Sequence, residues 1–317
     1  MAAPTTTSIR PSAAGSRVIA RLRGRTLPQQ RARMFYILIL PWLIGFVLFV
    51  LGPMIFSLGL SFTRWNLLNL PIPIGVENYV HMAHDALFWQ SLKVTTTYAI
   101  VSVPLGLVFA LLLALLLNQR VRGLAIFRTI FYLPSVASGV AVAVLFLWIF
   151  NPQFGLVNSL LSYVGIQGPG WLASTQWALP TLILMSLWSV GGTMIIFLAG
   201  LQNVPAELLE AASLDGAGIW QRFRFVTLPL LTPTILFNLV LLIINQFQTF
   251  TQAYTMTNGG PLYATLFYVY YLYLNAFQYL NMGYAAALAW VLFTIVLVLT
   301  VIVLRTSDRW VFYQGGA

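Results

Sequence analysis

The sequence predicts an all-α integral membrane protein with six transmembrane helices and both termini in the cytoplasm, and three observations support this prediction. Of the 317 residues, 60% are apolar and 7% are charged, whereas ordinary soluble domains have about 45–50% and about 25%. Four long stretches of the chain carry no charge at all. If these stretches cross a membrane, most of the basic residues outside them fall on one side of it. With a mean hydropathy of +0.87, the composition is typical of a fold whose solvent is largely lipid.

The uncharged stretches locate the membrane-spanning helices. They cover residues 34–63, 94–119, 129–206 and 225–304. An ionised side chain at the bilayer centre costs about 2.5–3.5 kcal/mol, and a spanning helix needs about 20 apolar residues. The first two stretches therefore hold one helix each, whereas the last two are long enough for two helices joined by a loop.

Turn-forming residues divide the two longest stretches. Asn-Pro-Gln-Phe-Gly at 151–155 and Gln-Gly-Pro-Gly at 167–170 separate predicted helices at 129–150 and 177–201. Thr-Asn-Gly-Gly-Pro at 257–261 separates predicted helices at 229–250 and 282–304. The segment 263–280 is apolar but rich in tyrosine, a residue that favours the membrane interface, so we predict an interfacial segment rather than a seventh span.

The basic residues orient the helices. Seven arginines lie in the first 35 residues, and the loops after spans two and four and the C-terminal tail bring the total on that side to 14, against only Arg64 and Lys93 on the other. By the positive-inside rule the richer side is cytoplasmic. Retention by this rule and contact with anionic lipid explain the net charge of +10 better than a nucleic-acid-binding arm, a transit peptide or a cleaved signal does.

The predicted organisation follows from the helices and their orientation. A basic cytoplasmic tail (1–33) precedes the first transmembrane helix (34–63) and an external loop (64–93). A core with five transmembrane helices (94–304) contains a cytoplasmic loop at 202–228, and a cytoplasmic tail (305–317) ends the chain.

Chemistry based on metals, thiols or bound nucleotide finds little support. The chain has no cysteine, its predicted spans have no ionisable side chain, and no phosphate-binding loop is present. A carrier coupled to protons or sodium usually keeps an ionisable group in the membrane, so energy is expected from another subunit. One cluster at helical spacing could bind a metal, although an amphipathic surface helix explains it better; it comprises Glu77, His81, His84 and Asp85.

The loop between the fourth and fifth predicted spans is rich in helix-forming and polar residues. Pro205 opens a short helix, Asp215 and Gly216 end it, and residues 219–226 form a second amphipathic helix before Pro229 opens the next span. On physical grounds alone this loop is either a docking element or a plain connecting hairpin.

Motifs in this loop and elsewhere resemble one family. Glu-Ala-Ala at 210–212, Gly216 four residues later and Val-Thr-Leu-Pro at 226–229 resemble the EAA signature of ABC importer permeases, with Val226 where Ile is usual. Glu-Asn-Tyr at 77–79, Phe-Trp at 88–89, Tyr-Leu-Pro at 132–134, Asn-Pro at 151–152 and the motif at 257–261 extend the resemblance over nearly the whole chain. The resemblance is to the sugar-type (carbohydrate uptake) permeases, on the branch with the maltose and glycerol-3-phosphate importers; Thr251 departs from it, because many relatives have Asp there.

The resemblance implies a fold, a mechanism and partners. It implies the type I permease fold in a bacterial or archaeal cytoplasmic membrane, with a second permease subunit, two cytoplasmic ATPase subunits and an extracytoplasmic solute-binding protein. This chain would be a transport subunit and would bind no cofactor, since ATP and Mg are used by the ATPase. Residues of the loop would couple the permease to the ATPase; these are Glu207, Glu210, Ala211, Ala212, Asp215, Gly216, Ile219, Trp220, Phe223, Leu228 and Pro229.

Uncharged polar residues in and just after the fifth span suggest the substrate path. They are Asn238, Asn245, Gln248, Thr249 and Gln252, with Tyr254 and Trp188 as possible stacking faces for a sugar ring. Hydrogen bonding between helices is the alternative role. The spans offer no cation to pair with an anion, which favours a neutral sugar over a phosphate ester; a glycerol-3-phosphate-type permease and a membrane-bound metal-dependent enzyme are the alternative functions.

Overall fold

The computed structural model describes residues 27–119 and 122–312, and the chain divides into two compact units, 1–57 and 58–317. The first unit contains α2 (Leu27–Phe46), the π-helical turn η1 (Val47–Leu51) and the start of α3 (Gly52–Ser61). From Met34 to Ser61 this segment is long and apolar enough to span a membrane, close to the predicted 34–63. Most of the predicted basic tail (1–33) lies outside the described residues.

The second unit begins with a short external segment. Strands β1 (Thr63–Arg64) and β2 (Ile72–Pro73) pair antiparallel and lead into α4 (Glu77–His84). Helix α5 (Ala86–Leu117) starts eight residues before the predicted start at 94. The helix begins there because the Asp85 carboxylate accepts a hydrogen bond from the Leu87 amide (2.9 Å) and caps it. Lys93 is therefore inside the helix and not in the loop.

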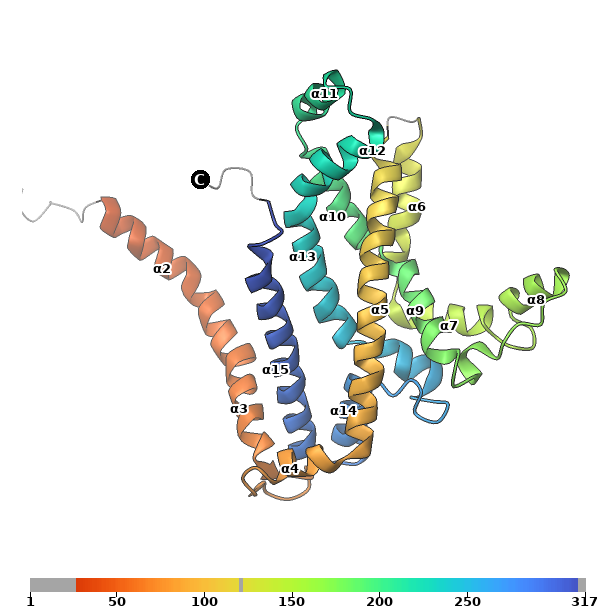
Figure 1. Cartoon of the computed structure of the whole chain (residues 1–317). Helices are drawn as coiled ribbons and strands as arrows, with labels where there is room; N and C mark the ends of the chain where they lie inside the picture. Colours follow the sequence, from red (N-terminus) through yellow and green to blue (C-terminus); the bar gives the residue numbers. More distant parts are fainter. Residues whose placement is uncertain (1–26, 120–121, 313–317) are drawn as a thin grey trace, which may run out of the picture. The chain divides into compact units, whose positions relative to one another are not determined.

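The rest of the second unit is helical, and α5 runs through its centre beside α6, α10 and α13 (Figure 1). Two clusters of buried apolar side chains flank α5, one with Tyr98 and Phe267 and the other with Ala114 and Phe197. The helical elements are α6 (Leu124–Val136), α7 (Gly139–Ile149), α8 (Leu156–Tyr163), η2 (Trp171–Ala173), α9 (Ala178–Ser186), η3 (Leu187–Ser189), α10 (Gly191–Gln202), α11 (Ala206–Leu214), α12 (Ile219–Arg222), η4 (Phe223–Thr227), α13 (Leu228–Phe247), η5 (Ala253–Thr257), α14 (Tyr268–Tyr273), η6 (Leu274–Gln278) and α15 (Met282–Ser307).

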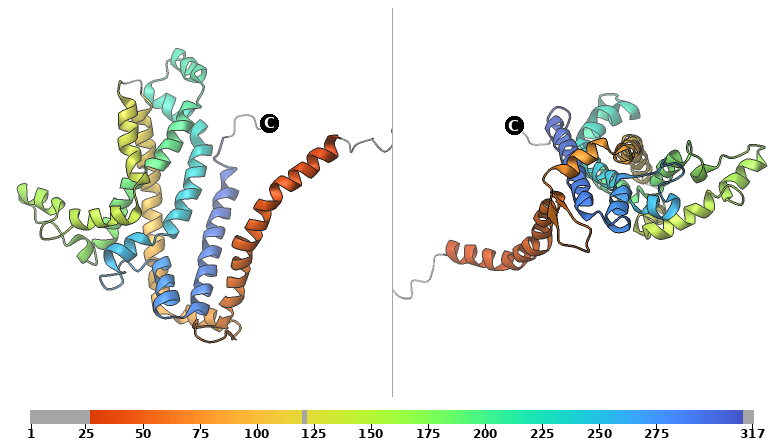
Figure 2. Two further views of the ribbon diagram at one scale, coloured as in Figure 1. Left: turned by 180° about the vertical axis from the view of Figure 1, so that it is seen from behind. Right: turned by 90° about the horizontal axis from the view of Figure 1, so that it is seen from below.

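Two predicted spans are sharply bent. The predicted helix at 129–150 is the pair α6 and α7, whose axes differ by 99°, and the predicted helix at 177–201 bends by 47° between Ser189 and Gly191. Figure 2 shows α7 turning away from the axis of α6. The sequence motif Tyr-Leu-Pro at 132–134 was expected to open the span, but Pro134 lies in the last turn of α6, and Ala137 after it is extended. Proline has no backbone N–H to donate, which favours the end of a helix nearby. The described residues contain four candidate spans, or six if each bent pair counts as one.

The fifth predicted span starts earlier than expected. Residues Ile219 to Phe247 form one continuous helical segment, so Pro229 lies inside a helix and does not open it. The π-helical turn η4 precedes Pro229, and at its end the Leu228 amide bonds to the Phe223 carbonyl five residues back. Such a widened turn accommodates a proline ring that would otherwise collide with the carbonyl four residues before it.

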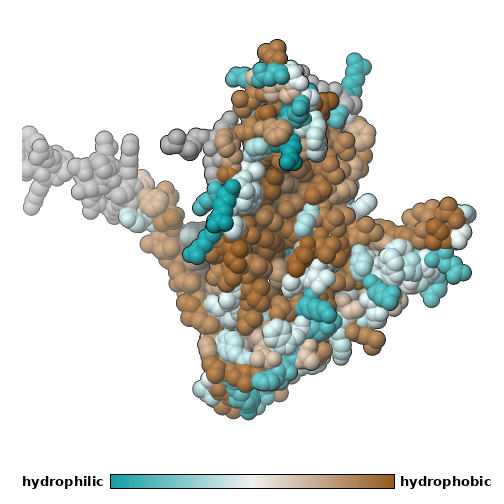
Figure 3. Space-filling model, in the orientation of Figure 1, coloured by the Kyte–Doolittle hydropathy of each residue, from teal (hydrophilic) through white to brown (hydrophobic). Residues whose placement is uncertain are grey.

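The tyrosine-rich segment 263–280 is not among the candidate spans of the described residues, in agreement with the prediction that it is not a seventh span. Its helical parts, α14 and η6, are short, and α14 packs against α5 and α15. Tyr268, Tyr270 and Tyr271 are buried within the protein. The exposed sides of the long helices are largely hydrophobic, and hydrophilic side chains gather towards the helix ends (Figure 3), as expected for helices surrounded by lipid.

Candidate functional site

A polar cavity of about 420 Å³ lies between the central helices of the second unit, and we call it the central cavity. Its walls come from α5, the α6–α7 junction, the bend between α9 and α10, and the end of α13 with the residues that follow it. Side chains with hydroxyl or amide groups supply its polar surface; they are Tyr98, Ser102, Ser135, Ser186, Ser189, Thr193, Asn245, Gln246, Gln248, Thr249, Thr251 and Gln252.

The two helix bends create this cavity. Pro134, Ala137 and Gly139 at the α6–α7 bend line it, as do Val190 and Gly192 at the α9–α10 bend. At a bend, the regular ladder of backbone hydrogen bonds is interrupted, and polar groups are released towards the interior. Irregular backbone at membrane depth is tolerated where it lines such a cavity.

Four of the five predicted substrate-path residues lie in the central cavity. Asn245, Gln248, Thr249 and Gln252 line it, whereas Asn238 does not. Asn238 lies seven residues before Asn245 on α13, about 10 Å away along the helix axis. Its side chain is 1% exposed, and its Nδ2 atom has no hydrogen-bond partner among the described residues.

Neither predicted stacking residue lines the cavity. Trp188 is 52% exposed and meets Phe146 edge-on with ring centroids 5.9 Å apart, and Tyr254 stacks on Phe250 at 5.3 Å. Each ring therefore contacts another aromatic ring of the protein and stays partly exposed, since Tyr254 is 43% exposed.

Helix α5 contributes residues to the cavity that were not predicted. Tyr98 and Ser102 line the cavity from that helix, and the Ser102 hydroxyl is fully buried without a hydrogen-bond partner among the described residues. A signal was present in the sequence, because Tyr98, Ser102 and Gly106 recur every fourth residue and so form one stripe on a helix. Thr251, where the resemblance led us to expect Asp in many relatives, also lines the cavity.

The described lining of the central cavity contains no charged side chain. Hydroxyl and amide groups both donate and accept hydrogen bonds, so this lining complements a ligand with many hydroxyl groups. A bound anion or cation would have no opposite charge there to offset its desolvation.

The predicted coupling residues lie in or next to a helical hairpin formed by α11 and α12. Gly216 joins the two helices at φ +81°, a conformation that glycine adopts without strain. The turn is closed by hydrogen bonds from the Gly216 amide to the Ser213 carbonyl (3.1 Å) and from the Ala217 amide to the Ala212 carbonyl (2.9 Å). Glu207, Glu210, Ala211 and Asp215 are exposed on this hairpin.

The apolar side chains of the hairpin divide into two groups. Ile219 and Trp220 are 82% and 70% exposed, and these side chains are available to a partner. Phe223 is half-buried in a groove of about 240 Å³ with Leu115 and Leu209. Leu228 and Pro229 are half-buried within the continuous helix that begins at Ile219; the structure thus places them beyond the hairpin.

The candidate metal cluster does not assemble. Glu77 forms an ion pair with Arg64 (2.8 Å), the His84 ring nitrogen Nδ1 lies 2.9 Å from the Val80 carbonyl, and the His81 ring packs edge-on against Tyr284. Asp85 caps α5 and also accepts a hydrogen bond from Tyr284. Within the described part of the chain, no three His, Cys, Asp or Glu side chains are grouped to hold a metal ion.

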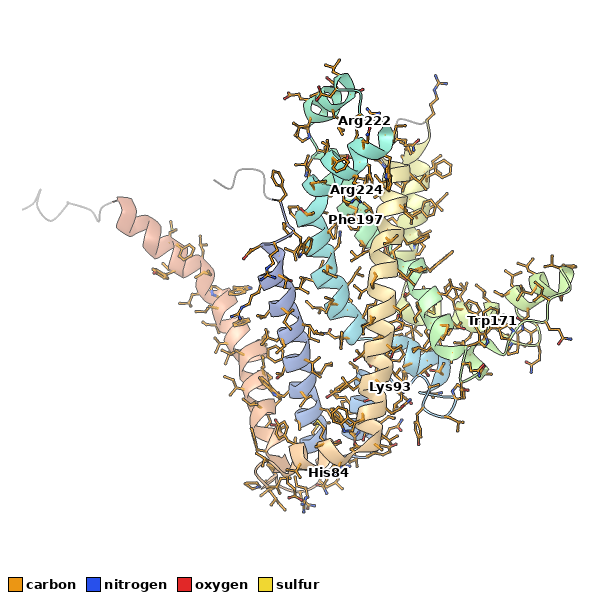
Figure 4. The ribbon with its side chains drawn as sticks, in the orientation of Figure 1. His84, Lys93, Trp171, Phe197, Arg222 and Arg224 are labelled. Atoms are coloured by element: carbon orange, nitrogen blue, oxygen red, sulfur yellow. The ribbon has the colours of Figure 1, made fainter. Side chains whose placement is uncertain are left out.

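Two arginines of the cytoplasmic loop predicted from the sequence lie near one end of the second unit. Arg222 and Arg224 lie near the end that carries α11 and α12, and His84 lies at the opposite end (Figure 4). The C-terminal segment returns to the arginine end, where the Phe312 amide donates a hydrogen bond to the Thr232 hydroxyl (2.8 Å).

Comparison with known families identifies the chain. Residues 102–311 match the family described as binding-protein-dependent transport system inner membrane component. The chain belongs to this family. The match covers the central cavity almost completely and the whole of the α11–α12 hairpin.

Individual relatives agree with the family assignment. The permease is 50% identical to the probable ABC transporter permease protein YesP of Bacillus subtilis (strain 168) over 285 residues, which cover 88% of this chain and 92% of that protein. It is 32% identical to the trehalose/maltose transport system permease protein MalF of Thermococcus litoralis, covering 89% of this chain and 96% of that protein.

Solved structures confirm the fold. The crystal structure of a bacterial ABC transporter involved in the import of the acidic polysaccharide alginate matches with a TM-score of 0.77 and 28% identity. The crystal structure of a bacterial alginate ABC transporter in complex with an alginate pentasaccharide-bound periplasmic protein matches with a TM-score of 0.78 and 27% identity, and each match covers 88% of this chain and 96% of the other. The permease is a multi-pass membrane protein of the type I fold and a transport subunit of a binding-protein-dependent importer, and the sequence-based assignment to the sugar-type permeases is confirmed.

Proposed function

We propose that this permease carries a neutral sugar or oligosaccharide through the central cavity, across the cytoplasmic membrane of a bacterium or archaeon. The uncharged hydroxyl and amide lining of the cavity carries the proposal. A volume of about 420 Å³ falls within the range of small-molecule sites, about 300–1,000 Å³. The name of the trehalose/maltose relative supports a neutral cargo, whereas the alginate importer handles an acidic one.

The energy comes from partner subunits in this proposal. Two cytoplasmic ATPase subunits hydrolyse ATP with Mg, and the α11–α12 hairpin docks into one of them through the exposed Ile219 and Trp220. A second permease subunit completes the path within the lipid bilayer. An extracytoplasmic solute-binding protein delivers the sugar, as supported by the alginate importer that was solved with its periplasmic protein.

Uptake by the complete importer tests the cargo. Cells that express all subunits are given labelled maltose, trehalose or glycerol 3-phosphate, and accumulation is followed over time. We expect neutral sugars to accumulate and the phosphate ester to be excluded. Accumulation of glycerol 3-phosphate with exclusion of both sugars would instead support the glycerol-3-phosphate-type permease.

The same assay tests the cavity. Gln248 lines the cavity, and its side chain bonds to no other described residue, so Gln248→Leu removes an amide without disturbing the fold. We expect sugar uptake to fall roughly tenfold, as for the loss of one or two buried hydrogen bonds. Gln167→Leu, in the segment between α8 and η2 and outside the cavity, is the control and should transport normally. Equal uptake by both variants would remove Gln248 from the path.

A further inference from the structure

We infer that the permease has a second saccharide-binding site, in a polar pocket at the end of the second unit that carries α4. The pocket has a volume of about 460 Å³ and shares no lining residue with the central cavity. The β1–β2 hairpin, α4 and the segment between η6 and α15 form its walls. Its volume also lies in the range of small-molecule sites, about 300–1,000 Å³.

Backbone contacts hold the walls of this pocket in place. The amides of Met282 and Gly283 donate to the Trp65 carbonyl (2.9 and 3.4 Å), and Gly283 lies so close to the Thr63 carbonyl that a side chain there would collide with it. The Asn78 amide nitrogen Nδ2 donates to the carbonyls of Ser61 and Thr63 (2.8 and 2.9 Å). The pocket is therefore formed before any ligand arrives, which lowers the cost of binding.

Two nearly buried amide groups supply hydrogen-bond acceptors. Asn78 and Asn275 are 8% and 4% exposed. Their nitrogen atoms are occupied, since Asn275 Nδ2 donates to the Tyr271 carbonyl (2.9 Å), but neither Oδ1 oxygen bonds to another described residue. Neither Oδ1 atom is among the fully buried polar atoms that lack a partner, and both residues line the pocket. Unpaired buried acceptors favour a ligand that donates hydrogen bonds.

Other side chains of the pocket supply donors and an apolar face. The amides of Asn69 and Asn281 line it without a side-chain hydrogen bond to any described residue. The indole of Trp65 is fixed because its Nε1–H donates to the Asn69 carbonyl (2.8 Å). An indole beside amide groups is a typical surface for the apolar face and the hydroxyl rim of a sugar ring.

The charges of the pocket favour a neutral ligand. Arg64 and Glu77 line the pocket and form an ion pair with each other, with 2.8 Å between a guanidinium nitrogen and a carboxylate oxygen. A cation or an anion would have to break this pair, whereas hydroxyl groups bind to the free donors and acceptors around it. The choice of a saccharide rests on the proposed function, and the predicted orientation places the pocket on the side from which cargo arrives.

Saturation-transfer NMR tests the inference on the assembled importer. The importer is held in lipid nanodiscs without its solute-binding protein, and maltose and trehalose are the probes. We expect saturation of the ring protons of at least one sugar. His81 also lines the pocket. In the Gln248→Leu background, which weakens binding in the central cavity, adding His81→Ala or Asn281→Ala should lower the remaining signal about fivefold, the size expected for losing one polar contact. His84→Ala is the matched control, because His84 lies on the same helix but outside the pocket, and should leave the signal unchanged.

The outcomes separate the two proposals. A sugar signal that disappears in Gln248→Leu alone, or that persists undiminished when His81→Ala or Asn281→Ala is added to it, would overturn the second site and leave the proposed function intact. The absence of any sugar signal in the unmodified importer would also overturn it. If the variants weaken binding of the solute-binding protein and leave the sugar signal unchanged, the pocket is a protein-docking site and the inference is wrong. Normal sugar uptake by Gln248→Leu would instead count against the role of the cavity alone.

Discussion

Asp85 links three elements at the end of the second unit that carries α4. Its carboxylate caps α5 through the Leu87 amide (2.9 Å) and accepts hydrogen bonds from the hydroxyls of Tyr271, in α14, and Tyr284, in α15. Partial burial alone would raise the pKa of Asp85, but these hydrogen bonds outweigh it, and the pKa lies below its ordinary value of 3.8. The folded protein thus stabilises the ionised carboxylate.

Acidification should weaken this contact. Because folding lowers the pKa of Asp85, the stability that it contributes is present above its ordinary pKa of 3.8 and is lost as the pH falls through the lower value in the folded state. We expect Asp85→Asn to lower the free energy of unfolding at pH 7 by about 1 kcal/mol, after allowance for solvent screening. Thermal denaturation in detergent between pH 3 and pH 7 measures both effects. Asp308→Asn, at an exposed position, is the control, and an identical pH profile for the two variants would contradict this role.

The left-handed backbone conformation at Gly216, rather than a lack of space for a side chain, limits which residues can replace it. At φ +81°, no atom lies within 4 Å of the position that a Cβ would occupy. Asparagine tolerates this conformation better than other L-residues, whereas most of them are strained by about 1–2 kcal/mol. We therefore expect Gly216→Asn to insert and transport better than Gly216→Val, and Gly216→Trp to insert normally but abolish uptake because its bulk blocks docking. Membrane abundance and uptake measured together check these outcomes, and full transport by Gly216→Trp would exclude the coupling role.

Close contact between helices fixes the two bends. At Gly191, the first residue of α10, a Cβ would lie 2.5 Å from the Phe131 carbonyl oxygen and 2.9 Å from the Tyr132 Cα atom in α6. At the neighbouring Gly192 nothing lies within 4 Å. The absence of one side chain thus allows α6 and α10 to approach beside the central cavity.

This pair of glycines provides a matched test of packing. We expect Gly191→Ala to destabilise the permease by about 1–3 kcal/mol, because backbone atoms must move to relieve the overlap. Gly192→Ala should be neutral or slightly stabilising, since alanine favours a helix by about 0.5–1 kcal/mol over glycine. The melting temperatures of the two variants, measured in the same detergent, test these expected changes in stability. Equal melting temperatures for the two variants would rule out tight packing at Gly191.

The sequence predicted the long helices well and the bends poorly. The uncharged stretches of sequence located α5 and α15, because a long apolar segment is expected to cross the bilayer. Such a segment does not reveal whether its helix axis bends. The 99° turn at Ala137 therefore stayed hidden. Asn245 and Gln248 were predicted because amide side chains stand out in an apolar helix, whereas the four-residue stripe of Tyr98 and Ser102 is only weakly polar and was not recognised.

The orientation of the whole chain follows from its arginines and is open to direct measurement. The chain contains no cysteine, so a single introduced cysteine reports its own location. We expect Asn69→Cys, in the predicted external loop, to react with a membrane-impermeant maleimide in intact cells. Ser213→Cys, exposed on α11, should react only after the membrane is permeabilised. The reverse labelling pattern would show that the predicted topology is inverted. The α11–α12 hairpin would then lie on the side of the membrane opposite the proposed ATPase.

The central cavity has no charged side chain in its described lining, and this property determines how transport responds to the electric field across the membrane. Moving one elementary charge through that field changes the free energy by about 2.3 kcal/mol per 100 mV. A neutral sugar that passes an uncharged lining moves no charge through the field. If the cargo is the proposed neutral sugar, uptake is therefore expected to proceed at the same rate in polarised and depolarised cells, as measured with labelled sugar before and after an ionophore is added.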